Sequence, residues 1–232
     1  VGLITYIRTD SVRIAQEAQE ECRAVVAAEY GQEYLPAKPP VYKTKTTSAQ
    51  EAHEAIRPTV VGRRPQDVKA FLTRDQFRLY QLIWARFVAS QMKAAVFDVM
   101  TVDLEGDAFL FRANGSKIKF PGFLTLYQED QDDKNEEEEG YLPDLQVDTA
   151  LVLQAVRPEQ HFTQPPSRYS EAMLVKTLEE NGIGRPSTCA TIIETIRKRN
   201  YVEMENKRFK PTELGLVVDR LLKENFPRVV DL

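Results

Sequence analysis

Cysteine, histidine and long apolar runs are all scarce in this chain of 232 residues. Its two cysteines, Cys22 and Cys189, stand far apart and form no Cys-x-x-Cys pair. That argues against a zinc ribbon and a disulfide framework, and it fits a reducing cytoplasm. The apolar runs are far too short to span a membrane, and no segment resembles a secretory signal. We therefore expect a cytoplasmic protein without membrane contacts.

Negative charge is concentrated in one short segment. The net charge is −4, but residues 128–140 hold eight acids and one base, so the rest of the chain carries about +3. Two stretches, residues 36–65 and 185–210, carry +4 each. Because local charge decides whether a surface attracts a polyanion, these stretches are candidates for nucleic-acid contact. Residues 128–140 are expected to form a solvated loop, with competition against DNA for basic surface as the alternative.

Periodicity and capping signals predict mixed helices and strands in the first two thirds of the chain. We expect a helix over 12–30 with Ser11 as its N-cap and Gly31 as its stop, and a short helix over 49–56. A longer helix should begin at the capping box Thr73-x-x-Gln76 and end near Met92. Antiparallel strands are expected over 95–127, with turns near Gly106-Asp107 and Asn114-Gly115, and strand character returns at 149–156.

A proline-rich linker then leads into a compact helical unit. Ser170 is expected to cap a helix ending near Asn181, and Ser187 a second helix ending near Asn200. A hairpin centred near Glu205-Asn206 and a helix over 213–224 should follow. This order is typical of a winged-helix-like DNA-binding unit.

Residues 4–11 read Ile-Thr-Tyr-Ile-Arg-Thr-Asp-Ser. In an extended strand, residues two apart share a face, so Tyr6 and Arg8 would point the same way. A phenol oxygen would then lie beside a guanidinium, whose fork of donors suits phosphodiester oxygens. Attack by such a tyrosine on DNA would keep the bond energy in a phosphotyrosine and allow resealing without ATP. An ordinary half-buried surface pair is the alternative for this dipeptide.

Two further motifs contain phosphate-binding residue types. Residues 48–59 read Ser-Ala-Gln-Glu-Ala-His-Glu-Ala-Ile-Arg-Pro-Thr, where His53 and Arg57 would share a face if the predicted helix extends to them. Residues 181–191 read Asn-Gly-Ile-Gly-Arg-Pro-Ser-Thr-Cys-Ala-Thr and lead into a predicted helix, whose free amide groups favour an anion. The alternatives are a satisfied histidine on a packed helix and a plain connection between two helices.

Taken together and in this order, the three motifs closely resemble those of the bacterial DNA topoisomerase I family, the type IA topoisomerases, along essentially the whole chain. Topoisomerase III fits less well, because proline usually precedes its first arginine and its last motif differs. Reverse gyrase shares much of the pattern but carries an attached helicase, of which this sequence has no trace.

The resemblance implies roles for individual residues. Tyr6 would be the nucleophile that becomes linked to the 5′ phosphate of cut single-stranded DNA, and Arg8 would hold the scissile phosphate. The residues implied to contact or support the DNA are Thr9, Asp10, Ser11, His53, Arg57, Arg185, Ser187 and Thr188. One departure is visible, since Cys189 stands where the family commonly has tyrosine.

The resemblance also implies an architecture: an α+β multidomain protein in which helical, winged-helix-like lobes flank a mainly antiparallel β hinge, as part of the toroid. Its expected domains are the catalytic tyrosine domain of the arch (1–92), the β hinge (93–160) and a DNA-binding domain of the base (161–232). The family's Mg²⁺ site lies on an N-terminal Toprim domain, so we expect none here. We expect an excised fragment that is inactive alone and monomeric, with single-stranded DNA and the Toprim domain as partners.

Two other interpretations remain open at this point. A winged-helix DNA-binding protein without enzymatic activity would have a merely structural Tyr6, and restoring the upstream domain would then give no covalent DNA adduct. A tyrosine recombinase also attacks phosphate with tyrosine. It normally needs arginines and histidine well before that tyrosine, whereas here they all follow it.

Overall fold

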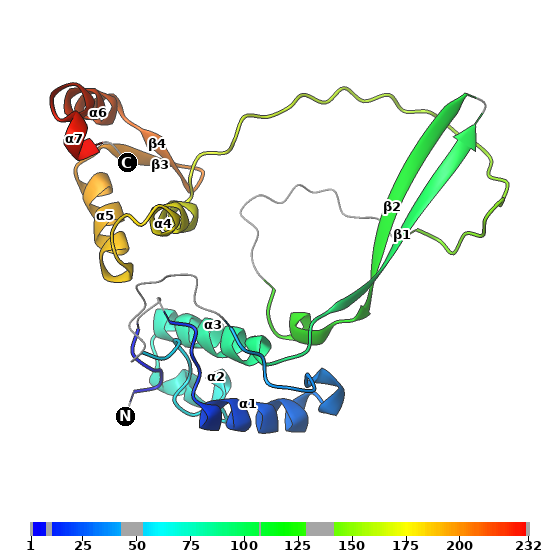
Figure 1. Cartoon of the computed structure of the whole chain (residues 1–232), viewed down its shortest axis with the longest axis horizontal. Helices are drawn as coiled ribbons and strands as arrows, with labels where there is room; N and C mark the ends of the chain where they lie inside the picture. The colour runs from blue at the N-terminus through cyan, green and yellow to red at the C-terminus, as the bar shows by residue number, and fades with distance from the viewer. Residues whose placement is uncertain (1, 8–10, 43–52, 107, 129–141, 231–232) are drawn as a thin grey trace. The chain divides into compact units, whose positions relative to one another are not determined.

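The computed structural model describes residues 2–7, 11–42, 53–106, 108–128 and 142–230, apart from the side chains of residues 186, 187 and 229 (Figure 1). The chain divides into two compact units, Val1–Leu153 and Gln154–Leu232. Helices and two antiparallel hairpins make up these units, which confirms the predicted α+β character. In the described part of the chain, no helix is long and apolar enough to cross a membrane.

Two helices, α1 (Gln16–Glu29) and α3 (Arg74–Ser90), form most of the core of the first unit. The buried residues of the cluster are Ala18, Cys22, Val26, Val61, Val68, Tyr80, Trp84, Phe87, Val88 and Met92. Helix α3 begins at the predicted capping box, where Thr73 and Gln76 exchange hydrogen bonds between side chain and backbone. Its aromatic stripe faces α1 and the short helix α2 (Pro65–Val68), because burying these large rings is the main driving force for packing here.

The start of α1 differs from the prediction. The helix begins at Gln16 rather than near Val12, and its N-cap residue Ala15 makes no side-chain capping bond. Ser11, the predicted N-cap, instead donates its hydroxyl to the backbone carbonyl of His53. A tertiary hydrogen bond has therefore replaced the local cap. The end agrees, because Gly31 adopts a φ of 103° just beyond the last turn.

The predicted helix over 49–56 is not formed in its described part. Residues 53–55 have no regular secondary structure and residue 56 lies in a bend, while residues 49–52 lie outside the described residues. His53 and Arg57 consequently do not share a helix face. The backbone groups of this segment instead form hydrogen bonds with residues 3–13. They therefore do not need the bonds that a helix would supply.

A long hairpin of β1 (Val96–Gly106) and β2 (Phe109–Phe120) follows α3 (Figure 1). Its chain reversal confirms the turn predicted near Gly106-Asp107. The turn predicted at Asn114-Gly115 is wrong, because these residues pair with Thr101 and Met100 in the middle of the ladder. The strand predicted over 149–156 is also absent.

The second unit contains α4 (Glu171–Glu180), α5 (Pro186–Lys198), the hairpin of β3 (Val202–Glu205) and β4 (Arg208–Pro211), α6 (Glu213–Asn225) and α7 (Pro227–Val230). Ser170 caps α4 as predicted, accepting a hydrogen bond from the amide of Met173. Ser187 does not cap α5, because the N-cap is Arg185 and Pro186 occupies the first helical position, where its missing N–H costs nothing.

Candidate active site

The candidate site is built where two chain segments distant in sequence run side by side. Ile4 and Pro58 form an antiparallel bridge. The amide of Thr5 donates to Arg57 O at 2.9 Å, and the amide of Thr59 donates to Leu3 O at 3.0 Å. The segment that carries Tyr6 is therefore paired, backbone to backbone, with the segment that carries His53.

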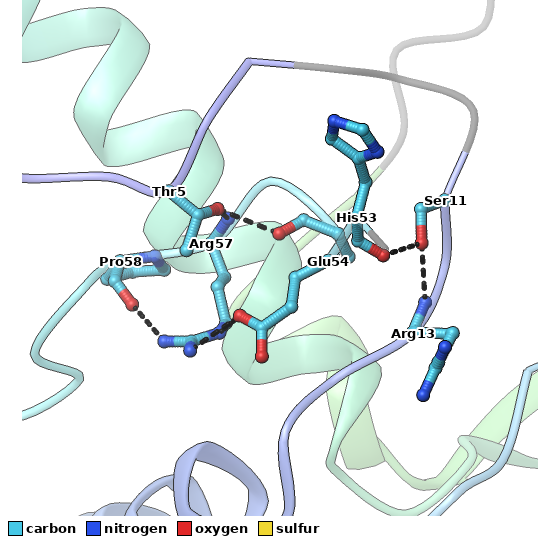
Figure 2. A network of polar contacts seen from close by, with 8 residues as sticks. Thr5, Ser11, Arg13, His53, Glu54, Arg57 and Pro58 are labelled. Atoms are coloured by element: carbon cyan, nitrogen blue, oxygen red, sulfur yellow. Dashed lines mark hydrogen bonds and ion pairs between the residues drawn. The ribbon is translucent and has the colours of Figure 1, made fainter. Parts of the chain in front are cut away.

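Two hydroxyl groups extend this pairing (Figure 2). Thr5 Oγ1 donates to Ala55 O at 2.8 Å and accepts from the Arg57 amide at 2.9 Å. Ser11 Oγ donates to His53 O at 2.6 Å and accepts from the Arg13 amide at 3.3 Å, and the amide of Ala55 donates to Arg13 O. Because Ser11 is buried, its hydroxyl supports the backbone of the site rather than facing solvent.

Among the predicted site residues that the structure brings together, Tyr6 and His53 have their rings in contact. Their ring centroids are 5.9 Å apart, with the ring planes inclined by 39°. Tyr6 is 72% exposed, so its hydroxyl is accessible to a large substrate. The Nδ1 atom of His53 is buried and has no hydrogen-bond partner among the described residues. The exposed phenol of Tyr6 therefore lies beside an imidazole whose Nδ1 is closed to solvent.

Arg57 is held by contacts within the protein (Figure 2). Its Nε and Nη2 both donate to Glu54 Oε2, at 3.0 and 2.7 Å, and its Nη1 donates to Pro58 O at 3.0 Å. Only 13% of the Arg57 side chain is exposed, against 35% for Glu54. The guanidinium thus ties together the residues on either side of the turn after His53.

The core helices anchor this region. Trp84 of α3 donates its indole N–H to Val61 O at 2.8 Å, and Tyr80 donates its hydroxyl to Arg63 O at 2.7 Å. A carboxylate oxygen of Glu21 on α1 accepts from the amides of Val61 and Gly62. The loop that leaves the paired segment is thereby fixed to both helices, which holds the His53 segment in place.

Three predicted residues, Arg8, Thr9 and Asp10, lie outside the described residues, as does the side chain of Ser187. In the second unit, Arg185 and Thr188 are both exposed at the start of α5. Thr188 Oγ1 accepts from the Arg185 amide at 2.8 Å and donates to Arg185 O at 3.1 Å.

The start of α5 offers fewer amide donors to an anion than the sequence pattern indicated. Pro186 has no N–H, and the amides of Thr188 and Cys189 both bond to Arg185 O. The local backbone conformation explains the two glycines of the motif, because Gly182 and Gly184 take φ values of 69° and 76°. Phosphate binding here would depend mainly on side chains.

Two residues of the site were missed in the sequence. Thr5 precedes the tyrosine, and nothing in its neighbourhood indicates that its hydroxyl would bridge Ala55 and Arg57. Glu54 did leave a signal, since an acid three residues before an arginine commonly forms a local ion pair.

Comparisons with known proteins agree with the motifs. A family model described as DNA topoisomerase matches residues 1–232. The solved structure of full-length topoisomerase I from Thermotoga maritima is 33% identical in sequence, with a TM-score of 0.78, over 99% of this chain. The chain belongs to the type IA DNA topoisomerase family. It spans 36% of the length of that solved relative.

Type IA topoisomerases use Mg²⁺, which makes the metal-binding capacity of this chain relevant. The described residues contain no group of three or more His, Cys, Asp and Glu side chains that could hold a metal ion. Among the described residues, the candidate site offers a phenol, an imidazole, hydroxyls and one carboxylate, Glu54, which is already paired with Arg57. This set suits phosphate oxygens better than a hard divalent cation, which prefers several carboxylates.

Proposed function

We propose that this chain carries the strand-cleaving tyrosine of a type IA topoisomerase and acts as part of a longer enzyme that relaxes negatively supercoiled DNA without ATP. The observation that carries the proposal is the exposed Tyr6 beside His53, on paired segments anchored to the core. Family membership supports it, because the matched segment includes all three motifs.

In the proposed reaction, the phenol oxygen of Tyr6 attacks a phosphorus atom of single-stranded DNA. A bond from that oxygen to phosphorus forms while the bond from phosphorus to the 3′ oxygen breaks. The phenol gives up its proton, and the departing 3′ oxygen gains one and leaves as a hydroxyl. Religation is the reverse attack of that hydroxyl, so one phosphodiester is exchanged for another and no external energy source is required.

The other residues bind and orient the phosphate. Arg8 would neutralise the charge that develops on its oxygens, the role for which a planar guanidinium is best suited. His53 would donate a hydrogen bond to the phosphate near the cut. Thr9 and Asp10 would support Arg8, and Ser11 would act through the backbone of His53, in keeping with its burial.

The rest of the DNA path is proposed to use the second unit. Arg185, Ser187 and Thr188 would contact the backbone leading into the site. The divisions 1–92, 93–160 and 161–232 would be the tyrosine domain, the arch hinge and part of the base. Magnesium would be bound by carboxylates of a Toprim domain elsewhere in the longer enzyme, since the described residues provide no suitable group.

The test is the covalent adduct formed on a labelled single-stranded oligonucleotide by the complete topoisomerase containing this sequence. Tyr6→Phe removes one hydroxyl and keeps the ring, so adduct and relaxation should disappear while DNA affinity and thermal stability barely change. If Tyr6 were merely structural, losing the hydroxyl would cost at most about 0.5–1.5 kcal/mol of stability, and activity would survive. An adduct on the Phe variant would contradict the proposal.

A further inference from the structure

Sequence alone places Arg57 among the DNA contacts, but its surroundings indicate a different role. All three guanidinium nitrogens already donate to oxygens of this chain, two to Glu54 and one to Pro58. The side chain is 13% exposed. To bind a phosphate, it would have to leave a partly buried carboxylate without its partner, which is costly.

The contacts around Arg57 converge on the backbone of His53. Arg57 bonds to Glu54, the residue directly after the histidine, and its amide is held by Thr5, the residue directly before the tyrosine. Ser11 holds the carbonyl of His53 itself. In Figure 2 the imidazole projects away from this network, while the bonds fix the chain beneath it.

The imidazole stands on a backbone that these bonds fix, and its ring lies against Tyr6. Its Nδ1 has no hydrogen-bond partner among the described residues, so no side-chain contact of that atom there orients the ring. A histidine metal or phosphate ligand is commonly oriented through its second nitrogen. Here the orientation would come from the hydrogen bonds and the ion pair on either side of the residue.

We propose that Arg57 is a positioning residue that holds His53 at its distance from Tyr6. It does so through its ion pair with Glu54 and through its bond to Thr5 on the tyrosine segment. This inference rests on the proposed function, because the distance from His53 to Tyr6 matters for the reaction only if Tyr6 is the nucleophile. Arg57 does not contact DNA, and its loss acts through His53. A misplacement of about 1 Å at a reacting group can cost about 10²-fold in rate, so the effect should be large.

The first test is epistasis, measured as the rate of adduct formation by the complete topoisomerase. Arg57→Ala should slow the reaction about 10- to 100-fold when His53 is present. In a His53→Ala background the same change should slow it by roughly twofold or less, because the residues act as one unit. Equal slowing in both backgrounds would overturn the proposal. Arg112→Ala, which removes an exposed ion pair in β2, is the matched control and should leave the rate unchanged.

The second test separates positioning from phosphate contact. Loss of a phosphate contact reduces the slope of log affinity against log salt by about 0.7 for single-stranded DNA. Positioning predicts an unchanged slope for Arg57→Ala. It also predicts slower adduct formation by Glu54→Gln, which keeps an acceptor oxygen but loses the charge. If Arg57 were instead a DNA ligand, Glu54→Gln would release its guanidinium and tighten DNA binding.

A rescue variant guards against misfolding and completes the test. Thr5→Val should slow adduct formation because it keeps the shape and removes the hydroxyl, and Thr5→Ser should restore most of the rate. If Arg57→Ala does not fold, the test rests on Glu54→Gln, Thr5→Val and Thr5→Ser. Wild-type rates of adduct formation for all three variants would overturn the proposal. An adduct on Tyr6→Phe would instead overturn the proposed function, whichever way these variants behave.

Discussion

Tyr6 has an exposed ring and directly follows a firmly attached residue. The residue before it, Thr5, is turned toward the neighbouring segment and bonded to it twice, whereas Tyr6 and Ile7 are 72% and 70% exposed. The attachment at Thr5 thus does not cover the two residues that follow it. This exposure is what the proposed role of Tyr6 requires, because DNA would have to reach the hydroxyl without unfolding the site.

Arg8 gives the sharpest further test at this scale. Arg8→Lys keeps the positive charge but loses the planar fork, so we expect adduct formation to slow by about 10²-fold. Arg8→Ala should be slower still. Single-turnover rates and oligonucleotide affinities should be measured together, with affinity changing less than rate. A loss confined to affinity would show that Arg8 serves only to bind DNA.

Helix α3 is one of the elements that hold the loop after the His53 segment. Its Trp84 and Tyr80 both donate to backbone carbonyls of the loop after the His53 segment. A buried aromatic ring with a polar tip satisfies the core and the loop at once. Trp84 is only 5% exposed, so its ring belongs to the core and its indole N–H to the bond with Val61.

Tyr80 makes the stability of this first unit sensitive to alkaline pH. Burial raises the pKa of Tyr80 above its ordinary 10.0, with Asp67 and Glu21 adding to the shift and Arg63 opposing it. The folded state therefore holds this proton more tightly than the unfolded state. Its stabilising contribution is complete below pH 10 and is lost as pH rises through the higher folded pKa.

We accordingly expect the unfolding temperature to fall as pH rises above about 10, the ordinary pKa of tyrosine. Tyr80→Phe should lower stability by about 1 kcal/mol at pH 8, where a hydrogen bond is lost, and should show a shallower fall above pH 10. Thermal unfolding followed by circular dichroism between pH 8 and 11 measures both. Parallel curves for the two proteins would show that Tyr80 does not cause the alkaline loss.

At the scale of the whole molecule, charge is separated along the chain. The acidic segment 128–140 carries −7, and the basic stretches 36–65 and 185–210 carry +4 each. The net charge of −4 therefore understates the capacity to bind a polyanion.

This chain should bind single-stranded DNA weakly, with affinity that falls as salt rises, because neutralised phosphates release counterions. Replacing residues 128–140 by an uncharged linker of equal length should strengthen binding modestly. A shuffled segment of the same composition is the control and should leave the affinity unchanged. Fluorescence anisotropy across a salt titration is the measurement, and an affinity independent of salt would contradict the prediction.

Much of this protein follows from its sequence alone. Helix α3, helix α4 and the end of α1 were predictable, because a capping box, a serine cap and a glycine stop act within one turn of chain. That two antiparallel hairpins would form was predictable as well, since the alternation of apolar and polar residues and the turn residues are also local signals. The three motifs and the family they indicate needed no coordinates.

Other features depended on contacts distant in sequence. Residues 53–56 do not coil, and Ser11 does not cap α1, because each finds its hydrogen bonds in the other's segment, 42 residues away for Ser11 and His53. Asn114-Gly115 stays inside β2 because its partners in β1 continue past it. Local propensity amounts to a few tenths of a kcal/mol per residue, about 1 for glycine, so a paired backbone or a buried hydroxyl overrides it. The sequence therefore pointed to the motifs that hold Tyr6 and His53, whereas the tertiary structure decided that Thr5 and Glu54 join them, that Arg57 pairs with Glu54 and that Tyr6 lies beside His53.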